Sequence, residues 1–331
     1  MAASVLVVLA VAGSQPPYEE PLRLRVGTGG PGGVYHEYGS GLADAAASSR
    51  AATEIVPVET AASVDNNRLI AAGSVDAAFT LADVAALAVS GDPPFDEPLP
   101  ISALARLYDN HTHLVVRSDS PYDELADLSG ATVSLGAEGS GTELTAQRLL
   151  DLAELRVAPR GEERGGVSAE SGGPRVQAVH LHVSESAQAL AEGRVDAFFW
   201  SGGLPTRAVA DLAARTPIRL IDLSDHVPAM AERHGEYFSD MPVPADTYEG
   251  VPAVRTIGVP SLLVVGDGMP AETARELTRL LFESRADLVD VHPVALSLHP
   301  RSAIATLPVP LHPGAVEYYR SVKNAYGPPA A

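Results

Sequence analysis

In the first third of the chain, segments with the alternating hydrophobic pattern of strands are followed by segments with the three-to-four-residue pattern of helices. Residues 22–26 (LRLRV) carry an apolar side chain at every second position, which predicts a strand with one buried face. A helix is predicted over 34–48, strands near 54–58 and 76–80, and a second helix near 63–72. Strand, helix, strand, helix, strand is the order of a doubly wound parallel unit.

The same order of elements returns in the second third of the chain. Its predicted strands and helices are, in sequence, 132–135, 143–155, 177–182, 186–192 and 196–200. The two units also end alike, because AGSVDAAF at 72–79 matches EGRVDAFF at 192–199. The second unit is longer by about the length of the polar, glycine-rich stretch 161–174, which we expect to be a surface insertion.

Each unit has a loop of small residues after its first strand. The loop is 27–33 (GTGGPGG) in the first unit and 136–142 (GAEGSGT) in the second. In open α/β sheets, ligands bind at the carboxyl ends of the strands, where these loops lie. Two such lobes facing each other would form a cleft lined by both loops.

The segments that follow the two units complete the predicted architecture. Residues 112–117 and 256–265 are expected to cross between the lobes as a two-strand hinge, and helices near 271–289 and 315–326 form the tail. We therefore predict an α/β fold with two doubly wound α/β lobes joined by a two-strand hinge. The expected boundaries are 22–110 plus about 262–331 for lobe I and about 111–261 for lobe II.

The composition narrows the class of protein. A chain of 331 residues, 46% hydrophobic and 20% charged, fits two soluble globular domains. Its formal charge of −19, from 42 acidic against 23 basic residues, repels nucleic acid and anionic membranes, so we expect no nucleic-acid partner. The absence of cysteine excludes disulfides, thiolate metal sites and cysteine nucleophiles.

The N-terminus has the pattern of an export signal. Residues 5–11 form a short apolar run, and AVA at 10–12 precedes a polar segment, as at a signal-peptidase site. We therefore expect residues 1–12 to be signal-like and the mature protein to be extracytoplasmic: secreted, periplasmic or cell-surface associated. No Arg or Lys precedes the run, so a disordered apolar leader stays open as the alternative. The run is too short to cross a bilayer, which takes roughly 18 or more apolar residues.

The first loop also offers a rival interpretation. Residues 27–32 (GTGGPG) satisfy G-x-G-x-x-G between a strand and a helix, and Glu59 ends the second strand, where a dinucleotide-binding unit places its ribose acceptor. This pattern keeps an NAD-dependent oxidoreductase open as an alternative function. Two features oppose it, because Pro31 removes a backbone N–H where a pyrophosphate needs donors and because a similar loop recurs in the second unit.

Other catalytic and metal patterns are incomplete. Residues 139–141 (GSG) lack the spacing of a G-x-S-x-G nucleophile elbow. The pairs His111/His113 and His180/His182 would each put two imidazoles on one face of a strand, yet neither has a third ligand at a familiar spacing. We therefore expect no catalysis, no metal and no cofactor.

The loops instead offer short neutral donors. Hydroxyls, an amide and backbone N–H groups at helix N-termini can hold a carboxylate without proton transfer. The side chains that supply them are Thr28, Tyr35, Thr60, Ser63, Asn66, Ser140 and Thr142. This pattern favours a binding site for a small carboxylate or amino acid.

Eight short motifs occur in a fixed order along the chain. They are 28–35 (TGGPGGVY), 60–66 (TAASVDN), 76–83 (DAAFTLAD), 127–130 (DLSG), 136–143 (GAEGSGTE), 193–199 (GRVDAFF), 203–205 (GLP) and 312–315 (HPGA). Together they make the chain, from about residue 22 to 326, resemble the TAXI family. These are the solute-binding proteins of a class of tripartite ATP-independent periplasmic (TRAP) transporters.

The resemblance implies a type II periplasmic-binding-protein clamshell. Its ligand would be a small acid such as glutamate, glutamine or a 2-oxoacid, delivered to the membrane permease subunit of a TRAP transporter that is driven by an ion gradient. The positions that match the family's ligand contacts are Gly33, Val34, Tyr35, Ser63 and Asn66 in one lobe and Ser140, Gly141 and Thr142 in the other.

The chain also departs from the family pattern. Ala61 and Ala62 replace a glycine pair, which narrows the freedom of that loop, and Leu81 replaces a glutamine expected in many members. Trp200 is predicted either in the core or on the cleft wall. These departures leave the ligand open, and a binding-incompetent sensor relative is a further alternative.

Overall fold

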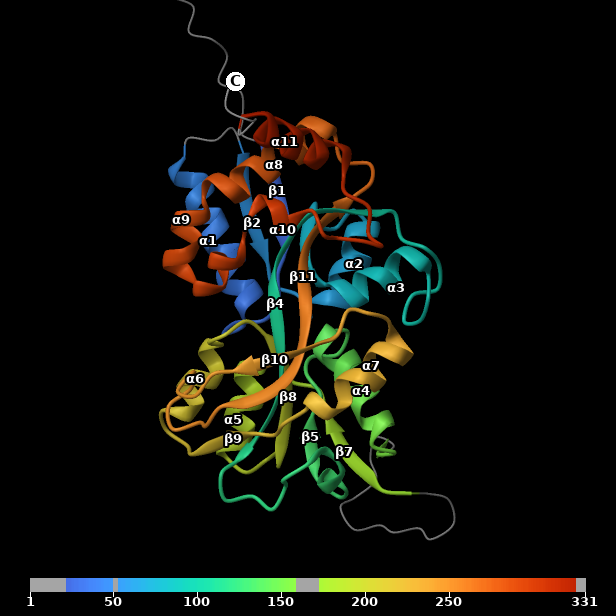
Figure 1. Ribbon diagram of the computed structural model, residues 1–331, viewed down its shortest axis with the longest axis vertical. Helices are drawn as coiled ribbons and strands as arrows, with labels where there is room; N and C mark the ends of the chain where they lie inside the picture. Colours follow the sequence, from blue (N-terminus) through green and yellow to red (C-terminus); the bar gives the residue numbers. More distant parts are fainter. Residues whose placement is uncertain (1–21, 50–52, 159–172, 326–331) are drawn as a thin grey trace, which may run out of the picture.

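A single mixed sheet runs through the whole molecule and carries helices on both faces (Figure 1). The computed structural model describes residues 22–49, 53–158 and 173–325. The predicted leader at 1–12 and most of the predicted insertion at 161–174 lie outside the described residues.

Lobe I is the half of the sheet built on β1, β2 and β3 with its covering helices. Its elements are β1 (Leu22–Gly27), α1 (Val34–Ser48), β2 (Thr53–Val58), α2 (Ser63–Ala71), β3 (Ala77–Leu81), α3 (Ala82–Ser90), α8 (Ala271–Glu283), α9 (Arg285–Val291), the 3-10 helix η3 (Pro293–Ser297), α10 (Pro300–Ala303) and α11 (Pro313–Ala325).

Lobe II is the other half. Its elements are η1 (Leu125–Leu128), β5 (Thr132–Ser134), α4 (Gly141–Leu152), β6 (Arg156–Val157), β7 (Arg175–Val179), α5 (Val183–Ala191), β8 (Ala197–Gly202), α6 (Arg207–Ala213), β9 (Ile218–Leu220), η2 (Ser224–His226), α7 (Val227–His234) and β10 (Ser239–Val243).

Two long antiparallel strands join the lobes. They are β4 (Ile101–Arg117) and β11 (Val254–Gly266), and the strand order is β2-β1-β3-β11-β4-β8-β5-β7-β6. β4 pairs with β11 as far as His111 and with β8 from His111 onward, so its partner changes where it passes from one lobe to the other. Each lobe has parallel strands in the order second, first, third, followed by an antiparallel crossing strand, which confirms the predicted type II periplasmic-binding-protein fold.

Helical periodicity explains how α1 is placed. Val34, Tyr38, Leu42, Ala45 and Ala46 recur at intervals of three or four, and all are buried. They belong to the core of lobe I together with side chains of β1 and β3. Since α1 must bury this stripe on the sheet, its first turn is fixed at the carboxyl end of β1, facing lobe II.

The tail corrects one expectation. The sequence predicted one helix near 271–289, but the structure breaks it at Ser284 into α8 and α9. α8 packs on α11, where Phe282 and Tyr318 stack with ring centroids 5.4 Å apart, while α9 packs on α1. A straight helix could not meet both partners. Within the described residues, no helix combines the length and apolar character needed to cross a membrane.

Candidate functional site

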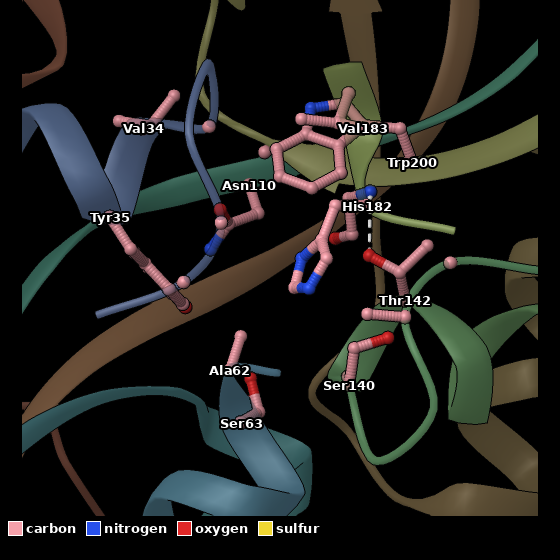
Figure 2. A pocket seen from close by; sticks show the side chains of 18 of the residues that line it. Val34, Tyr35, Ala62, Ser63, Asn110, Ser140, Thr142, His182, Val183 and Trp200 are labelled. Atoms are coloured by element: carbon pink, nitrogen blue, oxygen red, sulfur yellow. Dashed lines mark hydrogen bonds between the residues drawn. The ribbon is translucent and has the colours of Figure 1, made fainter. Parts of the chain in front are cut away.

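An enclosed cavity of about 40 Å³ lies between the lobes, at the carboxyl ends of their parallel strands (Figure 2). Loops of both lobes and the crossing strand β4 close around it. Its lining residues are Gly29, Gly30, Gly33, Val34, Tyr35, His36, Ala61, Ala62, Ser63, Leu81, Tyr108 and Asn110 from lobe I and β4, with Gly136, Ala137, Ser140, Gly141, Thr142, Leu181, His182, Val183, Phe199, Trp200, Ser201 and Gly202 from lobe II.

Seven of the sequence-predicted site residues come together at this cavity. They are Gly33, Val34, Tyr35, Ser63, Ser140, Gly141 and Thr142. Figure 2 shows Ser63 on the lobe I side and Ser140 and Thr142 opposite it on lobe II. The two small-residue loops therefore face each other across one space, as the pattern of the two units predicted.

Three other predicted residues lie beneath the loops and do not line the cavity. Thr28 Oγ1 donates to the Val58 carbonyl over 2.9 Å, and Thr60 Oγ1 donates to Asn66 Oδ1 over 2.7 Å. Asn66 Nδ2 donates to the carbonyls of Thr28 and Phe79 over 2.8 and 2.7 Å. All three polar side chains are buried, so they fix the shape of the two loops from below.

Sequence reasoning missed several lining residues. Asn110 comes from the middle of β4, where 17 mostly buried residues give no alternation that could single it out. His182 appeared only as part of a metal-like pair, although it lines the cavity. Trp200, left open between core and cleft, lies on the cleft wall, and its Nε1 donates to Thr206 Oγ1 over 2.8 Å.

Four helices begin at the cavity. They are α1 at Val34, α2 at Ser63, α4 at Gly141 and α5 at Val183, and each of these first residues lines it. The first turn of a helix presents unpaired backbone N–H groups and a partial positive charge. No Arg, Lys, Asp or Glu side chain lines the cavity, so its positive character comes from these helix ends.

Burial raises the pKa of both tyrosines that line the cavity, Tyr35 and Tyr108. Removal of its hydroxyl from water raises the pKa of Tyr35 far above the usual range, against hydrogen bonds from Ser261, Asn110 and Ser63. Burial likewise raises the pKa of Tyr108 well above its usual value. Both phenols are therefore neutral and can donate a proton to an acceptor.

Small residues let the lobes approach each other closely. A Cβ on Gly141 would lie 2.5 Å from Leu81 Cδ1 and 2.8 Å from Ser63 Oγ, so a larger residue there would displace these side chains. A Cβ on Gly33 would lie 2.9 Å from the ring of Trp200. Leu81, one of the family departures, therefore packs an apolar side chain against the facing loop.

Polar contacts also join the lobes directly. Arg148 on α4 and Asp83 on α3 form an ion pair at 2.5 Å, with 8% and 1% of their side chains exposed. The N–H groups of Val64 and Asp65 on α2 donate to the Gly139 carbonyl over 3.1 and 3.0 Å, and Ser184 Oγ donates to the Pro31 carbonyl over 2.7 Å. The molecule is in a closed arrangement.

A protein-family model described as the NMT1-like family matches residues 26–322, nearly the full length of the chain. The chain belongs to the NMT1-like family.

Solved structures resemble this NMT1-like protein at low identity. XAC2383 from Xanthomonas citri, bound to ATP, is 16% identical, with a TM-score of 0.50 over 90% of this chain and 98% of that one. An ancestral arginine-binding protein bound to arginine is 16% identical (TM-score 0.49, 83% and 98% covered). The aliphatic sulphonate binding protein SsuA from Escherichia coli is 15% identical (TM-score 0.42, 92% and 87% covered). At 16% identity, the first of these structures shows a similar fold and gives no information about the ligand of this chain.

One histidine of each pair in the NMT1-like chain has a structural partner. Both ring nitrogens of His113 lie 2.8 Å from an oxygen, the His111 carbonyl and the Tyr248 hydroxyl respectively. His180 Nε2 lies 3.0 Å from Glu143 Oε1. Across residues 22–49, 53–158 and 173–325, no three His, Asp or Glu side chains are grouped to hold a metal ion.

The glycine-rich loop of the NMT1-like chain is in contact with lobe II. Besides the bond from Ser184 to the Pro31 carbonyl, the Gly32 carbonyl accepts from the Ala208 N–H over 3.3 Å. Glu59, the ribose acceptor of the dinucleotide interpretation, is exposed and does not line the cavity. This arrangement suits a small ligand held between two lobes.

Proposed function

We propose that this protein is a solute-binding receptor that works outside the cytoplasm, captures a small carboxylate or amino acid between its lobes and delivers it to a membrane permease. The observation that carries the proposal is the enclosed cavity at which helices α1, α2, α4 and α5 of two lobes begin. Such helix ends stabilise a carboxylate without any proton transfer, so the proposal includes no catalysis and no cofactor.

The proposed ligand contacts are the predicted residues that line the cavity. Tyr35 and Ser63 would bind from lobe I, and Ser140 and Thr142 from lobe II. Because the two sets sit on different lobes, a ligand that touches both stabilises the closed arrangement relative to an open one. The change of strand partner at His111 of β4 supports a boundary there between lobe I (22–110 and 262–331) and lobe II (111–261).

The finer assignment is a receptor of TAXI type that serves a TRAP permease. It is supported by the eight ordered motifs, three of which (TGGPGGVY, TAASVDN and GAEGSGTE) supply lining residues of the cavity. The apolar segment at residues 1–12 supports export. Glutamate, glutamine and 2-oxoacids are the ligands that this assignment suggests.

Native mass spectrometry of the purified protein tests the proposal, because a tightly held solute would copurify as a fixed added mass. Trp200 gives a second readout, since it is the sole tryptophan of the chain and lines the cavity. We expect small carboxylates to change its emission and to raise the melting temperature by roughly 4 °C at a hundred times the dissociation constant. The variant Trp200→Phe should lose the emission change, which assigns that change to the tryptophan that lines the cavity.

Two outcomes would contradict the proposal. A melting shift with NAD and none with carboxylates or amino acids would favour the oxidoreductase. No shift with any solute and no copurified mass would favour a binding-incompetent relative.

A further inference from the structure

We propose that the cavity selects small anions that carry no ammonium group, such as short oxo- or hydroxy-acids, and rejects the amino acids of the same size. The inference rests on the proposed function and narrows its ligand class. It comes from which hydrogen-bonding positions of the lining groups are already occupied within the protein.

Three hydroxyls of the lining have their acceptor positions engaged by backbone N–H groups. Ser63 Oγ accepts from Leu81 over 3.1 Å, Ser140 Oγ from Glu143 over 3.0 Å, and Thr142 Oγ1 from Ser201 over 3.2 Å. The last of these is the dashed line in Figure 2. A hydroxyl carries one proton, and a bound N–H forces that proton away from itself. For Ser63 the Tyr35 hydroxyl is already a hydrogen-bond partner. Ser140 and Thr142 are at most 6% exposed, so their protons need an acceptor inside the cavity.

The Tyr35 hydroxyl lies in the same hydrogen-bond network. It accepts from Ser261 Oγ over 3.0 Å and is also bonded to Ser63 and Asn110. Ser140 and Thr142 lie at the N-terminal turn of α4, so these two residues supply the hydroxyl donors for a ligand.

The carboxylates that could balance the charge of an ammonium group are already engaged. Asp83 pairs with Arg148, and Glu143 accepts from the Gly139 N–H over 2.7 Å and lies 3.0 Å from His180. The Gly139 carbonyl accepts two N–H groups from α2. No carboxylate lines the cavity, so a buried ammonium would lose its hydration without a counter-charge.

The size of the cavity limits the ligand to a few heavy atoms. Its volume of about 40 Å³ fits about three water-sized spheres at ~10–15 Å³ each, so it favours the smallest acids. The side chains of Leu81, Leu181, Phe199 and Trp200 offer an apolar surface for the short carbon chain. No Arg or Lys is present to hold a second anionic group.

Matched pairs that differ only in the amino group test the inference. The wild-type protein is titrated with pyruvate against L-alanine and with 2-oxobutyrate against L-2-aminobutyrate, and binding is measured by calorimetry and Trp200 emission. We expect both oxoacids to bind and both amino acids to bind at least roughly 30-fold more weakly, the scale of a lost or unpaired charged hydrogen bond.

Each result has a fixed meaning. Equal or tighter binding of the amino acids overturns the inference and leaves the receptor function intact. If no acid of the set binds, the solute found by native mass spectrometry decides: an ammonium-bearing solute overturns the inference, and a small anion without ammonium supports it. A protein that binds no solute at all loses the proposed function as well.

A pair of variants on α4 tests the donor role. Thr142→Val removes one cavity hydroxyl, and Thr145→Val removes a buried hydroxyl three residues on that does not line the cavity. We expect Thr142→Val to weaken oxoacid binding roughly tenfold or more, as for a hydrogen bond to a charged group, and Thr145→Val to leave it unchanged. Ser140→Ala repeats the test at the residue that precedes α4. Equal effects of the Thr142 and Thr145 variants, or no effect of Thr142→Val and Ser140→Ala in folded protein, would refute the donor role.

Discussion

Ala62 occupies a backbone conformation that normally requires glycine. Its φ is 86° and its ψ −139°, and it is the residue that precedes α2. A Cβ in this region costs of order 1–3 kcal/mol, which the surrounding contacts must offset. Thr60 Oγ1 accepts the Ala62 N–H over 3.1 Å, and the Ala62 carbonyl accepts from Asn66, so the buried network beneath the loop holds the strained residue in place.

The strain predicts that Ala62→Gly stabilises the protein. We expect a gain of about 1 kcal/mol after the extra freedom of glycine in the unfolded chain is subtracted, and a rise in melting temperature of roughly 1–2 °C. Ala61→Gly is the matched control, because Ala61 does not have a positive φ and should lose stability on becoming glycine. Calorimetric melting of the two variants checks this, and a lower melting temperature for Ala62→Gly would contradict it.

His113 makes the stability depend on pH. Desolvation at this fully buried position on β4 lowers its pKa to about 4, with the nearby His111 acting in the same direction. The unfolded state then binds a proton below its ordinary pKa of 6.5 while the folded state does not, so stability falls as the pH drops from about 6.5 toward 4.

Between pH 7 and pH 5 this one group should cost about 2 kcal/mol of unfolding free energy. His113→Gln can keep a contact with the Tyr248 hydroxyl and does not titrate, so we expect its loss over the same interval to be smaller than that of the wild type by about that amount. Urea titrations at both pH values measure the difference. His111, His234 and His292, whose pKa values burial also lowers, contribute equally to both proteins. Identical losses in the two proteins would show that His113 is not the source.

At the scale of elements, local pattern was enough for those that repeat. The helix predicted over 34–48 is α1, with the same bounds, because its apolar stripe and the preceding glycines are both local signals. The loops that follow β1 and β5 were predicted to face each other from the similarity of the two units alone. Seven of ten predicted site residues line the cavity, and three of them, Gly33, Val34 and Gly141, were predicted only from the resemblance to the TAXI family.

The features that the sequence did not predict depend on packing between residues far apart in the chain. The break at Ser284 depends on which partners α8 and α9 meet, and Asn110 reaches the cavity through the register of β4 against β11. The sequence also did not predict that the side chains of Thr28, Thr60 and Asn66 bond to the protein beneath the loops and not to the cavity. A polar residue in a tight loop can bond either a ligand or the loop itself. Spacing along a chain does not distinguish these two uses.

At the scale of the whole molecule, the ion pair between Asp83 and Arg148 connects the two lobes and stabilises their contact. It connects α3 of lobe I to α4 of lobe II, and the Arg148 guanidinium also lies 5.9 Å from the centre of the Phe238 ring. If Arg148 is replaced, closure buries the Asp83 carboxylate without a counter-charge, whereas an open form leaves it in water. The pair therefore favours the closed arrangement only while both partners are present.

Arg148→Met should accordingly shift the ligand-free protein toward open forms. We expect a larger radius of gyration in small-angle X-ray scattering and solute affinity weakened roughly tenfold or more. Arg194→Met is the control, because its exposed partner Glu192 lies in the same lobe. Adding Asp83→Asn to Arg148→Met removes the unpaired charge and should restore part of the closure and of the affinity. If the double variant is as open as the single one, packing of the Arg148 side chain and not its charge holds the lobes together. If Arg148→Met changes neither scattering nor affinity, the pair has no part in closure.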